Sequence, residues 1–235
     1  MKPRVRYPLL AVVALLLAVS FPAVGVSAGP VTPMEAIARL KAGNATFVDK
    51  PEAALAITAD QRRGLAKGQS PFASVLSCAD SRVPPEVVFH TGLGELFVVR
   101  AAGHVADRSV LASLEYAAEH LHVPLIVVMG HEACGAVKAT IDTPPGKSLG
   151  PNLDFLIKAI RPAVNAAAGA PEATRLRAAI LENVADTLND LVDQSAILRE
   201  KFEGGEIGLV GGFYELSTGR VTFSEPIAAH GTTLR

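Results

Sequence analysis

The sequence predicts a single α/β domain with a mainly parallel central β-sheet flanked by helices. Two continuous apolar runs, at 96–99 and 125–129, are typical of strands covered on both faces. Between them, residues 109–122 carry apolar side chains at helical spacing, so the order strand, helix, strand indicates a right-handed parallel crossover. A later strand pair is expected at 207–213 and 221–223. Alternating elements of this kind predict one α/β layer structure.

The first element is expected to be an N-terminal helical arm. Thr32 suits the N-cap, Pro33 the first helical position, and Glu35 can complete a capping box. The apolar residues that follow at helical spacing are Met34, Ile37, Ala38 and Leu40. Because glycine and asparagine commonly end helices, the pair Gly43-Asn44 is expected to end this one.

The remaining elements follow from local signals. Residues 60–68 are polar and predict a second short helix or a loop, and residues 73–77 predict a short buried strand. A helical stretch is expected from Pro171 to about Phe202. Residues 144–151, rich in proline and glycine, predict a surface loop.

Residues 1–28 are typical of a cleavable signal peptide rather than of a folded domain. Three basic residues precede the apolar run from Leu9 to Phe21, and Val26-Ser27-Ala28 offers small residues at a cleavage site. The alternative is an uncleaved membrane anchor, but the run is short for a span of about 20 residues. We therefore expect a periplasmic or secreted protein whose single domain occupies residues 29–235.

Composition narrows the function classes. Removing the first 28 of 235 residues leaves 207, enough for one substantial core. The removed segment holds three basic and no acidic residues, so the formal charge changes from −1 to −4. Nucleic-acid binding requires clustered basic surface, which this chain lacks. No second apolar segment is long enough to span a membrane, so no membrane contact is expected after cleavage.

The chain has only two cysteines, and both lie in short patterns typical of metal ligands. Cys78 begins Cys-Ala-Asp-Ser-Arg, and Cys134 ends His-Glu-Ala-Cys, which begins at His131. Two thiolates and one imidazole form a ligand set of catalytic Zn²⁺ that leaves a fourth position open. The alternative is a Cys78–Cys134 disulfide, the default for two cysteines in an exported protein.

The ligand patterns are expected to converge. Cys78 follows the strand at 73–77 and His131 follows the strand at 125–129, and ligands of open α/β sheets bind beyond the carboxyl ends of strands. Beside them, Asp80 can accept a hydrogen bond from metal-bound hydroxide, or bind the metal as a fourth ligand in a closed state. Arg82 can hold Asp80 in a bidentate pair and keep it off the metal. The alternative for these two residues is an ordinary surface ion pair.

The combination of Cys-x-Asp-Ser-Arg and, 53 residues after Cys78, His-x-x-Cys-Gly resembles the beta class of carbonic anhydrases. The similarity covers roughly Pro33 to Phe223. It extends through Gly43-Asn44, Gln69-Ser70-Pro71, Gly94-Glu95-Leu96-Phe97-Val98-Val99-Arg100, Ala102-Gly103, Leu114-Glu115-Tyr116-Ala117, Val127-Val128-Met129-Gly130 and Gly211-Gly212-Phe213-Tyr214.

The resemblance implies one Zn²⁺ per chain, reversible hydration of CO₂ to bicarbonate and a proton, and specific roles for nine residues. Cys78, His131 and Cys134 would bind zinc, and Asp80 and Arg82 would form the catalytic dyad. The substrate pocket would comprise Gln69, Phe97, Ala102 and Tyr116. It also implies a homodimer or a tetramer of dimers, with Gln69, Phe97 and Tyr116 contributed by the neighbouring subunit.

Two departures from the family pattern carry expectations. The family usually has Arg-Asn-Ala-Gly-Asn where this chain has Arg-Ala-Ala-Gly-His, and His104 is a candidate proton shuttle because imidazole titrates near neutral pH. The chain has no Trp, which some relatives use in an inhibitory bicarbonate pocket, so the open state with Asp80 paired to Arg82 is expected to prevail. The alternative functions are hydrolysis of carbonyl sulfide or carbon disulfide, and a non-catalytic exported zinc-binding module.

Overall fold

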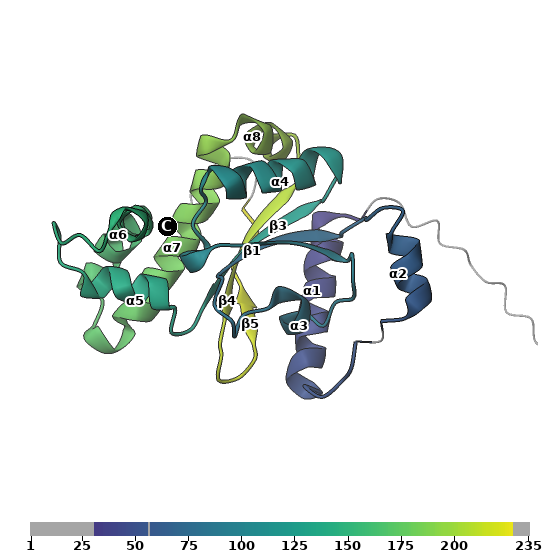
Figure 1. The fold of residues 1–235 in the computed structure, drawn as a ribbon, viewed down its shortest axis with the longest axis horizontal. Coiled ribbons are helices and arrows are strands. Elements are labelled where there is room, and N and C mark those ends of the chain that lie inside the picture. Colours follow the sequence, from purple (N-terminus) through teal and green to yellow (C-terminus); the bar gives the residue numbers. More distant parts are fainter. Residues whose placement is uncertain (1–30, 56, 228–235) are drawn as a thin grey trace, which may run out of the picture. The chain divides into compact units, whose positions relative to one another are not determined.

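The computed structural model describes residues 31–55 and 57–227; the predicted signal peptide lies outside them. These residues form a five-stranded sheet with the order β2-β1-β3-β4-β5 (Figure 1). Its strands are β1 (Ala73–Ser77), β2 (Leu96–Arg100), β3 (Leu125–His131), β4 (Gly208–Tyr214) and β5 (Val221–Phe223). The first four in this spatial order are parallel, and β5 is antiparallel to β4. The predicted fold class is confirmed.

Helices cover both faces of the sheet (Figure 1). They are α1 (Pro33–Asp49), α2 (Ala59–Leu65), α3 (Pro85–Val88), α4 (Arg108–His120), α5 (Gly135–Asp142), α6 (Pro151–Ala166), α7 (Glu172–Gln194) and α8 (Ala196–Glu203). Buried side chains of α1 and α3 pack on one face, where Val75 and Val127 point. Those of α4, α7 and α8 pack on the other face, against Leu76 and Ile126. None of the described helices is both long and apolar enough to cross a membrane.

The elements that the sequence left unassigned lie beside one end of the sheet. α5 and α6, together with the first half of α7, form a third apolar cluster that includes both cysteines. The expected loop at 144–151 joins α5 to α6. The expected helical stretch at 171–202 is divided at Ser195, whose backbone is extended and whose hydroxyl accepts from Leu198 N to begin α8.

The expected end of the first helix at Gly43-Asn44 is wrong, because α1 continues to Asp49. The capping box of Thr32 and Glu35 is present as predicted. Asn44 is buried and serves packing: its Nδ2 donates to Val88 O and Gly219 O at 3.1 and 2.8 Å, and its Oδ1 accepts from Val221 N at 2.9 Å. The pair therefore ties α1 to distant backbone instead of ending the helix.

Gly43 supplies the close approach that this arrangement requires. A Cβ at Gly43 would lie 1.8 Å from the carbonyl oxygen of Phe89. Because that neighbour is backbone, Gly43→Ala is expected to lower the free energy of unfolding by about 3 kcal/mol, or roughly 6–12 °C in melting temperature. Thermal unfolding followed by circular dichroism measures it.

Gly64→Ala is the matched control, since a Cβ at Gly64 in α2 meets no atom within 4 Å. Alanine in an open helical position is expected to raise stability by about 0.4–1 kcal/mol. If the two variants unfolded at the same temperature, the proposed contact between α1 and Phe89 would be wrong.

Candidate metal centre

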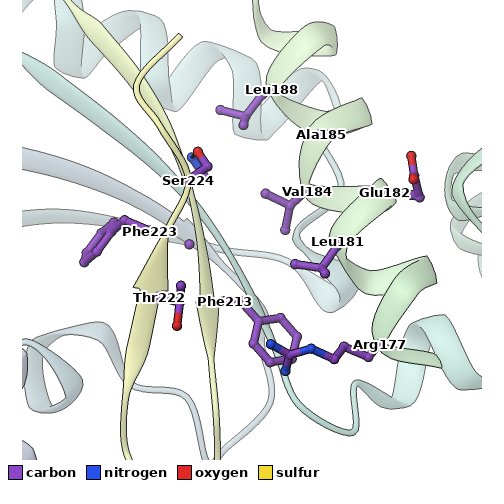
Figure 2. Close-up of a pocket in the computed structure, with 12 residues that line it drawn as sticks. Arg177, Leu181, Glu182, Val184, Ala185, Leu188, Phe213, Thr222, Phe223 and Ser224 are labelled. Carbon is purple, nitrogen blue, oxygen red and sulfur yellow. Dashed lines mark hydrogen bonds between the residues drawn. The ribbon is translucent and has the colours of Figure 1, made fainter. Parts of the chain in front are cut away.

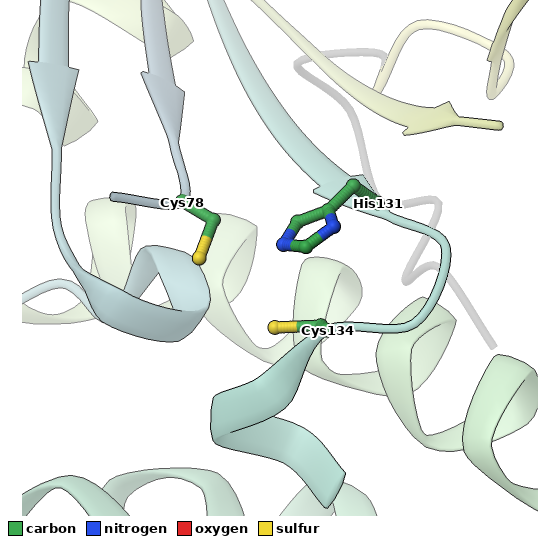
Figure 3. Close-up of side chains that lie close together, drawn as sticks. All are labelled: Cys78, His131 and Cys134. Atoms are coloured by element: carbon green, nitrogen blue, oxygen red, sulfur yellow. The ribbon is translucent and has the colours of Figure 1, made fainter. Parts of the chain in front are cut away.

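The structure brings Cys78, His131 and Cys134 together at the carboxyl edge of the sheet. Their sulfur and ring-nitrogen atoms all lie within 4.8 Å of one another (Figure 3). Cys78 is 5% exposed, and His131 and Cys134 are fully buried. Residues from two loops separated by more than 50 positions thus form one N/S cluster, as the strand pattern predicted.

Strand pairing and one strained turn set this cluster. Ser77 at the end of β1 pairs with Met129 of β3, so Cys78 leaves the sheet beside the end of β3. β3 runs two residues beyond the strand expected at 125–129, so His131 is its last residue rather than a residue of the following loop. Ala133 then has a φ of +54°, in the left-handed region, and this turn lets Cys134 return as the N-cap of α5.

The His131 ring has the orientation of a metal ligand. Its Nδ1 lies 2.9 Å from Glu132 O, and because a carbonyl oxygen only accepts, Nδ1 carries the proton. Nε2 is therefore the ring nitrogen left to bind a metal, and it is buried without a hydrogen-bond partner among the described residues. A backbone carbonyl that fixes the tautomer in this way is typical of metal-binding histidines.

The two sulfur atoms share one proton, which leaves the negative charge on Cys78. The Cys134 thiol hydrogen-bonds to Cys78 and lowers the pKa of Cys78 to about 3, while burial acts in the opposite direction. The pKa of Cys134 is raised because this thiol holds the proton that the pair shares. Gly103 N also donates to Cys78 Sγ at 3.3 Å. Both cysteines are free in the structure, and the donor set fits Zn²⁺.

Asp80 and Arg82 form a bidentate pair beside the cluster. Arg82 Nε donates to Asp80 Oδ1 at 2.9 Å and Nη2 to Oδ2 at 2.7 Å, and Arg82 N also donates to Oδ1 at 3.0 Å. These bonds hold the pKa of Asp80 well below its usual range. Asp80 Oδ2 lies 4.0 Å from His131 Nε2. The carboxylate therefore stays ionised at the margin of the cluster and is held there by Arg82.

Arg100 is a residue of this site that sequence reasoning did not single out. Its Nε donates to Cys78 O at 3.0 Å and its Nη2 to Asp80 O at 2.6 Å. It therefore ties the end of β2 to the turn that carries both residues. The only signal in the sequence is an arginine at the end of an apolar strand, and that pattern does not reveal which carbonyls it reaches.

The four predicted pocket residues do not gather around the cluster within this chain. Ala102 is exposed and precedes Gly103, so it lies close to Cys78. Phe97 pairs with Ser74, four residues and about 13 Å along the strand before Cys78. Its ring lies 6.2 Å from that of Tyr116, which is 47% exposed on α4. Gln69 is exposed after α2.

The surroundings of His104 oppose its candidacy as a proton shuttle. The ring is fully buried, and burial lowers its pKa to about 4. Its Nε2 lies 2.9 Å from Asn183 Nδ2. A ring that stays neutral near pH 7 and has no contact with solvent cannot carry protons from the metal centre to solvent.

A separate apolar cavity of about 390 Å³ lies between α7 and the β4–β5 pair (Figure 2). Arg177 lies over the Phe213 ring at its rim, with Cζ 4.1 Å from the ring centroid. None of the nine predicted site residues lines this cavity.

Comparisons with known proteins agree with the geometry. A family model described as carbonic anhydrase matches residues 73–221. Carbonic anhydrase 2 of Mycobacterium tuberculosis (strain H37Rv) is 39% identical over 201 residues, which cover 85% of this chain and 96% of that protein. The carbonic anhydrase of Mycolicibacterium smegmatis is 38% identical over 192 residues, covering 80% and 92% respectively.

Solved structures show the same fold. The beta-carbonic anhydrase of Coccomyxa in complex with acetazolamide matches with a TM-score of 0.65 at 25% identity, covering 86% of this chain and 89% of that one. A tetrameric beta-carbonic anhydrase of Sordaria macrospora matches with a TM-score of 0.64 at 24% identity, covering 80% and 93%. The chain therefore belongs to the beta class of carbonic anhydrases and is an enzyme of the carbonate dehydratase type.

Proposed function

We propose that this protein catalyses the zinc-dependent, reversible hydration of CO₂ to bicarbonate and a proton. The observation that carries the proposal is the buried cluster of two thiols and an imidazole nitrogen that has no hydrogen-bond partner among the described residues, with an ionised carboxylate 4.0 Å from that nitrogen. A storage site needs the cluster but has no need of the Asp80–Arg82 pair.

Cys78, Cys134 and His131 Nε2 would hold the Zn²⁺. When bound, zinc lowers the pKa of a coordinated water from about 15.7 towards 7 and so supplies a nucleophile near neutral pH. Asp80 accepts a hydrogen bond from the attacking water and orients it towards CO₂. Arg82 fixes the two oxygens of Asp80 and thereby keeps the carboxylate from taking the fourth position itself. We propose that this open, paired state prevails at neutral pH.

We propose further that the enzyme works as a homodimer or a tetramer of dimers. Within one chain, Phe97 and Tyr116 lie on the edge strand β2 and the adjacent helix α4, away from the cluster. A neighbouring subunit would supply these rings and Gln69 to complete an apolar pocket for CO₂. The related Sordaria macrospora enzyme is tetrameric. The signal pattern at residues 1–28 supports a periplasmic or secreted location.

Stopped-flow CO₂ hydration by the chain from Gly29, with zinc content measured on the same sample, tests the proposed reaction. Fast hydration at about one zinc per chain is the expected result. Full zinc occupancy without hydration between pH 7 and 9 would contradict it. Carbonyl sulfide and carbon disulfide turnover on the same preparation would show whether either exceeds CO₂ as substrate.

A further inference from the structure

A backbone turn joins the metal cluster to the interior of α7. Residues Ala102–His104 form a tight turn after β2 in which Gly103 and His104 both have positive φ, and Gly103 N donates to Cys78 Sγ at 3.3 Å. Hydrogen bonds to a thiolate stabilise its lone pairs and fix where the sulfur lies. The position of the Gly103 peptide therefore bears directly on how Cys78 presents its sulfur.

Asn183 of α7 holds this turn from the opposite side. The side chain is 2% exposed, and its Nδ2 donates to Gly103 O at 2.8 Å and lies 2.9 Å from His104 Nε2. Because Gly103 O only accepts, the amide nitrogen must face it. Its second hydrogen then points to His104 Nε2, which makes His104 a neutral ring that accepts this bond.

The turn is also confined sterically. Gly103 has a φ of +64°, and a Cβ there would lie 2.7 Å from Ile160 Cδ1 and 3.2 Å from Ala136 Cβ. Gly103 is therefore packed against α5 and α6. Asn183 ties the Gly103 carbonyl and the His104 side chain to α7. Among the described residues, the hydrogen bonds between the turn at 102–104 and side chains of α7 are those of Asn183.

We propose that Asn183 is a positioning residue of the metal centre: it holds the Gly103 N–H against Cys78 Sγ and thereby sets the donor strength of that sulfur towards the metal. The proposal rests on the proposed zinc site. Groups that hydrogen-bond directly to a ligand typically change metal affinity 10- to 100-fold when lost. Asn183 is one step further out, because it bonds to Gly103 O and acts on Cys78 through the Gly103 backbone, so a smaller loss is expected. Asn183 touches neither substrate nor metal.

The test compares wild-type protein with Asn183→Asp, which keeps the shape but removes the donor, and with Asn183→Leu, which removes both polar atoms. Each is loaded with Co²⁺ in place of zinc, and the sulfur-to-cobalt charge-transfer band is recorded. Zinc affinity is measured by competition with a chelator. The expected results are a band shifted to lower energy, because the sulfur lone pair is no longer stabilised, and a zinc affinity about three- to tenfold weaker, below the range for a direct partner of a ligand.

Val184→Ala is the control for a general loss of packing around α7. Val184 is the residue after Asn183, is buried, and packs on the sheet. It should lower thermal stability without moving the cobalt band. An unshifted band in the folded Asn183 variants, or an equal shift in Val184→Ala, would overturn the inference while leaving the zinc site intact. A wild-type protein that binds neither metal would overturn the proposed zinc site and the inference together.

Discussion

Replacing Cys78 with serine is expected to abolish zinc binding and CO₂ hydration together. The Cys78 thiol is one of only two thiols in the chain, and the cluster has no further cysteine or histidine among the described residues to replace it. A serine hydroxyl does not ionise near neutral pH, so the site would lose a negatively charged soft ligand. Metal catalysis contributes several kcal/mol to transition-state stabilisation, and each 1.36 kcal/mol is tenfold in rate. The expected loss is therefore about 10³-fold or more.

Zinc content by elemental analysis and stopped-flow hydration on one sample measure both losses. Ser77→Ala is the matched control, because Ser77 is the adjacent buried residue and its hydroxyl has no hydrogen-bond partner in the part of the chain that the structure describes. That variant should keep its zinc and its activity. Hydration by a zinc-free Cys78→Ser protein would contradict the proposed mechanism.

Asp80→Asn is expected to retain zinc but to lose about 10²- to 10³-fold in hydration rate, within the range for a positioned proton acceptor. The asparagine removes the negative charge of Asp80. Arg82 donates to both oxygens of that carboxylate, and Oδ2 lies 4.0 Å from His131 Nε2. Retained zinc with lost activity would separate a catalytic role for Asp80 from a ligand role. The measurements are the hydration rate and the zinc content of the purified variant.

The matched control is Asp60→Asn, which breaks the pair of Asp60 with Arg63 on the exposed helix α2. That pair is solvent-exposed and remote from the cluster, so no change in rate is expected. Full activity in Asp80→Asn would instead favour the non-catalytic zinc-binding module.

The low pKa of Asp80 determines the pH range in which protonation of this carboxylate can change activity or stability. Its folded pKa is depressed by the hydrogen bonds of Arg82, so the carboxylate is ionised throughout the neutral range. The stability that this pair contributes is present above the unfolded pKa of about 3.9 and is lost only as the pH falls below it. A loss of activity between pH 6 and 8 would therefore arise from another group.

Strands β1, β3 and β4 were predictable because each is a short, mainly apolar run covered on both faces, a pattern that local sequence carries. The end of the first helix was not predictable from local sequence. Glycine and asparagine have the same local preferences whether they end a helix or pack against another segment. At Gly43 and Asn44 the deciding partners are the carbonyls of Phe89, Val88 and Gly219. Val88 and Gly219, the two partners of Asn44, are 44 and 175 positions away from it along the chain, so no local stretch of sequence contains them.

Sequence alone determined the ligand types, their spacing and the convergence of Cys78 and His131, because the carboxyl ends of parallel strands share one edge. Only the tertiary structure decided what surrounds them. It showed that His131 presents Nε2, that Arg100 and Gly103 hold Cys78, and that His104 is buried against α7. Hydrogen-bond partners and burial depend on which distant segments pack together, and a linear pattern of residue types does not specify that.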